Sequence, residues 1–208
     1  MQLPNHVSAP LSMQMPSEGD RVTCRLPSAA HPLRSFTLAG AAQDIRDRHG
    51  VAVDEVACDI TTEAGRAAVL DAAGHVDILV NNAGGPPPGD FRDWSRDTWI
   101  AALDANMLAA FDLIKAVIDP MIENRFGRIV NITSGSVKSP IPQLGLSNGA
   151  RAALTGFCAG LSRQVARHNV TINGLLPGQF NTDRIEMLIA NMAKTENRSP
   201  ADIRTMLE

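Results

Sequence analysis

The 208-residue sequence contains no tyrosine, and aromatic residues make up only 4% of it. It also lacks the ~20 consecutive apolar residues that a membrane-spanning helix needs, and it shows no apolar core of a secretory signal. Its three cysteines are far apart and form no CxxC pair (Cys24, Cys58 and Cys158). These absences exclude a disulfide scaffold and a cysteine-based zinc site. They predict neither a metal site nor a membrane partner, and they suit the reducing cytoplasm.

The charges nearly balance, because 19 Lys and Arg stand against 22 Asp and Glu, which gives a formal net charge of −3. A general nucleic-acid binder usually carries a basic footprint, so nucleic acid is not an expected partner. With 44% hydrophobic and 20% charged residues, the chain has the composition of a globular protein. Its length fits one domain or at most two small ones.

The first 39 residues differ in composition from the rest. Five of the 13 prolines fall there, and the hydrophobic residues follow neither a helical nor a strand period. We therefore predict an irregular segment over 1–39 and a single α/β domain over 40–208.

From residue 40 onward, short apolar runs alternate with amphipathic stretches. Helical patterns end at 49, resume at 61 or 62 as far as about 74, and return over 96–124 and near 150–165. Strand-like runs cover 51–57, 76–80, 128–132 and 170–176. Short buried strands that alternate with helices indicate βαβ units. The chain is therefore expected to form a parallel sheet with helices on both faces.

Small or polar residues follow each of these strands. Ligands of open α/β sheets bind beyond the carboxyl ends of the strands, so this convergence is the main functional signal in the sequence. The segments concerned are Cys58-Asp59, 81–85, 133–136 and Pro177-Gly178, with Thr182 four residues beyond.

These segments resemble the short-chain dehydrogenase/reductase family. The matching blocks are ILVNNAGG (78–85), Asn106, GRIVNITS (127–134) and NVTINGLLPGQFNT (169–182), and the resemblance covers residues 40 to about 185. It is closest to the branch of 3-oxoacyl-carrier-protein reductases. The resemblance implies a Rossmann-like doubly wound parallel sheet and NAD or NADP as cofactor. It also implies a small-molecule substrate with a carbonyl or hydroxyl group, and a homo-oligomer formed through the two long helices.

The resemblance also assigns a cofactor role to eight positions. They are Asp59, Asn81, Ala83, Gly84, Arg151, Pro177, Gly178 and Thr182. Ala83 and Gly84 lack bulk, so the backbone can pass close to an adenosine ribose, and the Asn81 amide can pin neighbouring strands. Each block has a plainer structural alternative: a Gly-rich turn at 81–85, an N-cap aspartate at Asp59 and a strand-terminating turn at Pro177-Gly178.

Catalysis in the family uses an Asn, a Ser, a Tyr and a Lys, and the matching positions here are Asn106, Ser134, Ser147 and Arg151. Ser147 stands where the tyrosine passes the proton, but a Ser hydroxyl is a far weaker acid than a phenol, whose pKa is ~10. Arg151 keeps its charge and can bond ribose hydroxyls, but it cannot join a proton relay. Lys138 is a possible substitute acid, with an ordinary exposed lysine as the simpler interpretation.

Both ends of the chain depart from the family pattern. The only glycines before residue 60 are Gly19, Gly40 and Gly50, which cannot form the Gly-rich turn that cradles a pyrophosphate. The family's last strand is not visible either, so we expect an incomplete domain. If 1–39 supply no strand, an apolar strand edge is left exposed.

Three hypotheses follow. The family resemblance favours an NAD(P)-dependent oxidoreductase. The missing tyrosine favours a catalytically impaired or non-enzymatic homologue that binds a nucleotide or a partner. The unusual first 39 residues are compatible with a nonfunctional gene fragment.

Overall fold

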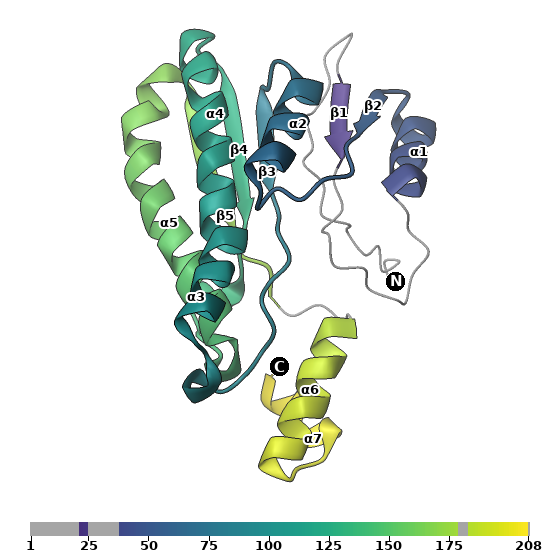
Figure 1. Ribbon diagram of the computed structural model, residues 1–208, viewed down its shortest axis with the longest axis vertical. Coiled ribbons are helices and arrows are strands. Elements are labelled where there is room, and N and C mark those ends of the chain that lie inside the picture. Colours follow the sequence, from purple (N-terminus) through teal and green to yellow (C-terminus); the bar gives the residue numbers. More distant parts are fainter. Residues whose placement is uncertain (1–20, 25–37, 179–182, 208) are drawn as a thin grey trace.

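The computed structural model describes residues 21–24, 38–178 and 183–207 (Figure 1). Its strands are β1 (Arg21–Cys24), β2 (Ala52–Glu55), β3 (Ile78–Asn81), β4 (Gly127–Ile132) and β5 (Val170–Leu175). Its α-helices are α1 (Leu38–His49), α2 (Glu63–Ala73), α3 (Arg96–Leu103), α4 (Ala109–Glu123), α5 (Gly145–Val165), α6 (Asp183–Glu196) and α7 (Pro200–Leu207). A π-helical turn, Asp104–Leu108, joins α3 to α4. This alternation confirms the predicted α/β class.

The strands form two separate parallel sheets in the described part of the chain. β3, β4 and β5 make a three-stranded sheet in that order, and β1 pairs with β2 in a two-stranded sheet. In the view of Figure 1, β1 lies between β2 and β3, but it pairs with β2 alone. Among the described residues, β3 is therefore one of the two edge strands of its sheet, and β5 is the other.

The segment 1–39 is not wholly irregular, so that prediction is corrected. β1 lies within it and pairs with β2 from Arg21 opposite Ala52 to Cys24 opposite Glu55, and α1 already begins at Leu38. A strand of four residues is too short to show a clear period of two, which is why composition missed it. The strand-like run predicted over 51–57 is also shorter, since β2 ends at Glu55.

The helix ends follow the predicted signals. Gly50 comes directly after α1 with a φ of +65°, and Gly74 comes after α2 with a φ of +62°, a conformation that favours glycine at helix C-termini. Thr62 is the N-cap of α2, because its Oγ1 accepts a hydrogen bond from the Gly65 N–H at 3.0 Å. The threonine pair at 61–62 therefore starts α2 as expected.

The main core lies between the three-stranded sheet and the helices that pack on it, chiefly α4 and α5 (Figure 1). Leu79, Ile129 and Ile172 lie opposite one another on neighbouring strands, and all three are buried. The apolar face predicted for α4 supplies Ile114 and Met121, which are 1% and 0% exposed. Burial of side chains of this size stabilises the sheet–helix layer by ~1.5–3 kcal/mol each.

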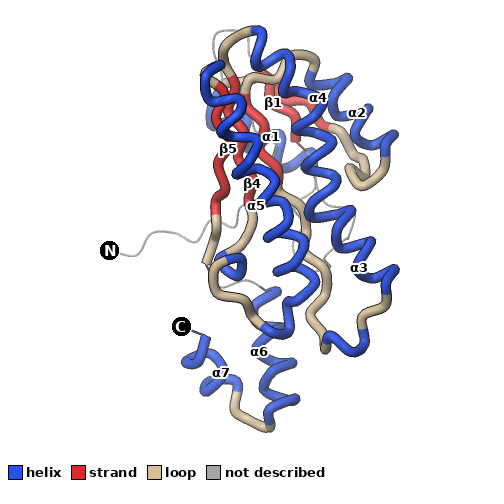
Figure 2. Tube along the Cα trace, turned by 90° about the vertical axis from the view of Figure 1, so that its left-hand side faces the viewer, coloured by secondary structure: helices blue, strands red, loops and turns tan. Residues whose placement is uncertain are grey.

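A second small apolar cluster belongs to the C-terminal helices. Ile189 and Met192 of α6 pack with Ile203 of α7, and Leu144 contacts this cluster from the turn before α5. Figures 1 and 2 show α6 and α7 beyond the carboxyl ends of the strands. None of the described helices is long and apolar enough to cross a membrane.

Candidate active site at the carboxyl edge of the sheet

The segments that follow β3, β4 and β5 meet at one edge of the sheet. Asn81, the last residue of β3, lies opposite Asn131 of β4. The Thr133 N–H donates to the Leu175 carbonyl at 2.8 Å, and the Gly135 N–H donates to the Pro177 carbonyl at 2.8 Å. These backbone bonds extend the β4–β5 pairing into the loops, so the predicted segments at 133–136 and 177–178 lie against one another.

Arg151 of α5 ties this edge together. It is only 9% exposed, and its Nη1 donates to the carbonyls of Ile132 and Thr133 at 2.9 and 2.6 Å. Its Nη2 donates to the Ala83 carbonyl at 3.3 Å, in the loop after β3. The planar fork of a guanidinium suits several acceptors at once. Arg151 therefore connects α5 to the ends of both β3 and β4.

Ser147 lies one helical turn before Arg151 and is bonded to it. The Arg151 Nε donates to the Ser147 Oγ at 3.1 Å, as the four-residue spacing on one helix face allows. Ser147 is 5% exposed. Because its oxygen accepts from a cation, its hydroxyl hydrogen is left to donate elsewhere.

Asn106 brings an unsatisfied polar atom to the cavity that Arg151 also lines. It lies in the π-helical turn, is 5% exposed, and donates from Nδ2 to the Ala102 carbonyl at 3.3 Å. Its Oδ1 is buried and accepts no hydrogen bond from any residue that the structure describes. A cavity of about 20 Å³ is lined by Asn106, Arg151, Asn81 and Ala83 among others. Such a space holds about one water molecule, which could bond this oxygen.

Ser134 sits at the start of the loop after β4, next to the Thr133 carbonyl that Arg151 binds. Its Oγ accepts from the Ser136 N–H at 3.1 Å and lies 2.9 Å from the Ser136 Oγ. The structure thus places Asn106 and Arg151 at one cavity and bonds Ser147 to Arg151, whereas the Ser134 Oγ is bonded within its own turn. Lys138 is exposed at the end of that turn.

A chain of buried amide and thiol groups lies beneath this edge. Asn81 Nδ2 donates to Asn131 Oδ1 at 2.9 Å, so the expected pinning of neighbouring strands by Asn81 is present. Asn131 Nδ2 in turn donates to the Cys158 Sγ at 3.3 Å. Burial raises the pKa of the Cys158 thiol to about 11, although the Asn131 bond lowers it. Asn131 and Cys158 were not expected beneath this edge from the sequence, although asparagine in two adjacent buried strands was the available signal.

We expect Cys158 to react with iodoacetamide about 100-fold more slowly than an exposed thiol at pH 8. Only the thiolate is nucleophilic, and because the pKa of the Cys158 thiol is about 11, very little thiolate is present at that pH. Peptide mapping by mass spectrometry measures this, with the part-buried Cys58 as internal comparison. The folded state also holds this proton more tightly than the unfolded chain, so the thiol's contribution to stability is lost as pH rises from about 9 to 11. Equal labelling of both cysteines at pH 8 would contradict the prediction.

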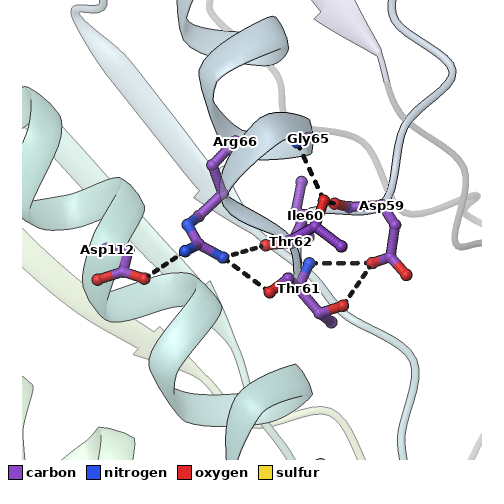
Figure 3. A network of polar contacts seen from close by, with 7 residues as sticks. All are labelled: Asp59, Ile60, Thr61, Thr62, Gly65, Arg66 and Asp112. Carbon is purple, nitrogen blue, oxygen red and sulfur yellow. Dashed lines mark hydrogen bonds and ion pairs between the residues drawn. The ribbon is translucent and has the colours of Figure 1, made fainter.

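Asp59 lies in a braced turn before α2 (Figure 3). Its Oδ1 accepts from the N–H and the hydroxyl of Thr61 at 2.9 and 2.8 Å, and its carbonyl accepts from the N–H and the hydroxyl of Thr62 at 3.1 and 2.7 Å. The simple N-cap alternative is therefore wrong in detail, since Thr62 is the cap and Asp59 organises the turn that precedes it. A role of Asp59 at an adenine stays a prediction.

The glycines of the edge show where a ligand has room. A Cβ added at Gly84 or at Gly178 would meet no atom of the described residues within 4 Å, so that part of the chain leaves room for a ligand at the backbone there. In the described residues, Gly40 lies inside α1 and Gly50 directly follows it, and neither forms a strand-to-helix phosphate cradle. Neither glycine therefore supplies the Gly-rich turn that would hold the pyrophosphate of a dinucleotide. Thr182, the remaining predicted contact, lies outside the described residues.

Comparisons with known proteins agree with this geometry. The model of the short chain dehydrogenase family matches residues 28–193. Acetoacetyl-CoA reductase of Cupriavidus necator is 39% identical over 122 residues, which are 58% of this chain and 49% of the relative. The 3-oxoacyl-[acyl-carrier-protein] reductase FabG of Vibrio cholerae is 35% identical over 165 residues, 76% of this chain and 67% of FabG. The chain thus spans between half and two thirds of the length of these relatives.

Solved structures show the same fold. YwfH, an NADPH-dependent reductase involved in bacilysin biosynthesis, is similar with a TM-score of 0.69 and 30% identity over 76% of this chain and 64% of that one. An actinorhodin polyketide ketoreductase variant with NADPH gives a TM-score of 0.73 and 28% identity over 89% and 70% of the two chains. The fold is therefore Rossmann-like, and the family model covers well over half of the sequence. By its sequence, its fold and the residues at its strand ends, the chain belongs to the short chain dehydrogenase family.

Proposed function

We propose that this protein is an NAD(P)-dependent oxidoreductase that acts on the carbonyl or hydroxyl group of a small molecule. The observation that carries the proposal is the meeting of three strand-end segments at one edge of the sheet. The backbone bond from Gly135 to Pro177 joins the segments after β4 and β5, and Arg151 joins the segments after β3 and β4. Ligands of open α/β sheets bind at such an edge. The names of its relatives support the class, since the similar proteins include acetoacetyl-CoA and 3-oxoacyl reductases. We therefore propose 3-oxoacyl thioesters as the first substrates to test.

The residues would divide between the two ends of the cofactor. Asp59 would face the adenine; Asn81, Ala83 and Gly84 would flank the adenosine ribose; Pro177 and Gly178, with Thr182, would line the nicotinamide. When bound, NADPH or NADH supplies the hydride. We also propose a cytoplasmic homo-oligomer with no nucleic-acid or membrane partner.

At the substrate, Ser134 would donate a hydrogen bond to the carbonyl oxygen, because its Oγ accepts from the N–H and the hydroxyl of Ser136 and its own hydrogen is left to donate. Ser147 is a second donor, because Arg151 already occupies one of its lone pairs. Neither hydroxyl is a strong acid, so slow turnover is expected. Asn106 would hold one water with its unpartnered Oδ1, and Arg151 would position the edge rather than pass a proton.

Nucleotide binding without turnover is the second candidate. It is favoured by the hydrogen bonds of Arg151, four of which go to Ser147 and to backbone carbonyls of the protein itself. A guanidinium held in this way braces the loops and adds no proton transfer. The absence of tyrosine from the sequence points the same way.

Gly84→Val tests the site directly. The added side chain enters open space, where no protein atom lies within 4 Å of the Cβ, so folding should be unaffected while the approach of a ribose is blocked. We expect NADPH and NADH to bind the unaltered protein weakly, and the variant to bind about tenfold more weakly or not at all, a loss of ~1.4 kcal/mol or more. Calorimetry measures both affinities.

Gly156→Val is the matched control, since its Cβ would also meet nothing within 4 Å and Gly156 lies on α5 away from the edge. Cofactor oxidation with acetoacetyl-CoA then separates the two candidates. Turnover that Gly84→Val abolishes supports the oxidoreductase, and binding with no turnover supports the second candidate. No binding of either dinucleotide, or equal effects of the two valines, contradicts both.

A further inference from the structure

The two sheets need a connection that is not a shared strand. Within residues 21–24, 38–178 and 183–207, β1 and β2 form one sheet and β3, β4 and β5 another. The turn that carries Asp59 follows β2, whereas Asn81 and Gly84 follow β3. A ligand that spans both places requires a fixed distance between them. No backbone ladder joins the two sheets in the described chain, but Ile60 of the turn is buried in the main core with Leu79 of β3.

Arg66 of α2 makes polar contacts in both directions (Figure 3). Its Nη1 donates to the carbonyls of Ile60 and Thr61 at 2.9 and 3.0 Å, within the turn that follows β2. Its Nη2 forms an ion pair with Asp112 Oδ2 at 2.9 Å. Asp112 lies in α4, which packs on the three-stranded sheet. The Arg66 guanidinium thus binds the turn after β2 through Nη1, and through Nη2 it binds α4, which packs on the three-stranded sheet.

The surroundings make this contact stiffer than an ordinary surface ion pair. The Arg66 side chain is 18% exposed and that of Asp112 is 39% exposed, so solvent screens the pair only in part. The turn is braced internally by the bonds from Thr61 to Asp59. Gly65 packs so closely on the Asp59 carbonyl that a Cβ at position 65 would collide with it. The turn is therefore packed directly on the start of α2 and bonded to Arg66.

We propose that Arg66, through Asp112, is a positioning residue that holds the turn at residues 59–62 in place relative to the β3–β4 edge. The inference rests on the proposed function, because it holds that the contact between Arg66 and Asp112 sets the distance between the adenosine end and the rest of the dinucleotide site. Loss of the contact would loosen the adenosine end alone, while Ile60 keeps the turn packed on the main core. The nicotinamide end is built on β4 and β5 and does not touch Arg66.

The test uses two halves of the cofactor as probes. 5′-AMP reports the adenosine end, and nicotinamide mononucleotide reports the other end; both are titrated into labelled protein by NMR. We expect Arg66→Met and Asp112→Asn to weaken 5′-AMP binding about tenfold, with less than a twofold change for nicotinamide mononucleotide. Arg66→Lys keeps the charge for Asp112 but loses the two-carbonyl fork, so its effect should be intermediate. Arg48→Met removes an exposed ion pair of α1 and is the control.

Hydrogen exchange keeps the inference testable on its own. Arg66→Met should speed amide exchange at Thr61 and Thr62, with amides of β4 unchanged. Equal losses for both probes, or no loss for either, would overturn the positioning role. If the unaltered protein binds neither probe, the proposed function fails, and unchanged exchange at Thr61 and Thr62 would then overturn the positioning role independently.

Discussion

Arg151→Met is expected to lower the free energy of unfolding by about 3–5 kcal/mol, since a buried charged group with several partners is removed. Methionine has a similar length and keeps most of the packing. It donates no hydrogen bond, however, and the carbonyls of Ile132, Thr133 and Ala83 all lose the donor that Arg151 supplies. Each carbonyl left unpaired in a buried place costs ~1–3 kcal/mol. Small domains are stable by only ~5–15 kcal/mol, so the loss is a large part of the total.

Urea unfolding measures this effect, with Arg163→Met as the matched control. Arg163 lies on the same helix, is exposed, and donates to the Ala159 carbonyl of its own helix at 2.9 Å. Its replacement should change stability by at most ~0.5 kcal/mol. Arg151→Lys should fall between, because an ammonium keeps the charge but cannot reach three carbonyls with one planar fork. Equal unfolding midpoints for both methionine variants would show that the Arg151 contacts do not stabilise this edge.

The second large effect concerns turnover. Ser147→Tyr combined with Arg151→Lys is expected to raise carbonyl reduction by ~10²–10⁴-fold, the usual contribution of a placed general acid. A phenol extends further from α5 than the Ser147 hydroxyl and is a stronger acid, with a pKa of ~10 that a neighbouring ammonium lowers. The two residues are in contact in the present site. Their effects should therefore be coupled, with the double variant exceeding the product of the single ones.

The assay is oxidation of the reduced cofactor with acetoacetyl-CoA and a panel of ketones. Ser162→Tyr combined with Arg163→Lys, near the other end of α5, makes the same chemical changes away from the site and should leave turnover unchanged. Since Arg151→Lys also loses hydrogen bonds to backbone carbonyls, the double variant should unfold at a lower urea concentration than the unaltered protein. Fast turnover by the unaltered protein, with a slower double variant, would mean that another acid is used, and Lys138 would be mutated next.

The sequence predicts those features that depend on neighbours along the chain. Alternating runs of apolar residues predicted α5 and the strands β3 to β5 close to their observed bounds, whereas the single helix predicted over 96–124 is divided into α3, the π-helical turn and α4. The four-residue spacing placed Ser147 and Arg151 on one helix face, and Thr62 and Gly74 marked the ends of α2. Residues at strand ends could be assigned to one edge because the carboxyl ends of parallel strands share it. Periodicity and capping are local properties, so a single sequence carries them.

Only the tertiary structure decided which partners the long side chains bind and which separate elements contact one another. The spacing on α5 left Arg151 free to face a cofactor, whereas packing directs its guanidinium to the carbonyls after β3 and β4. The ion pair of Arg66 with Asp112 joins helices that are far apart in sequence, and no pattern within either helix predicts it. The pairing of β1 with β2 was likewise hidden, because β1 has only four residues. Such contacts depend on distances through space, which the chain sets only when all its elements pack together.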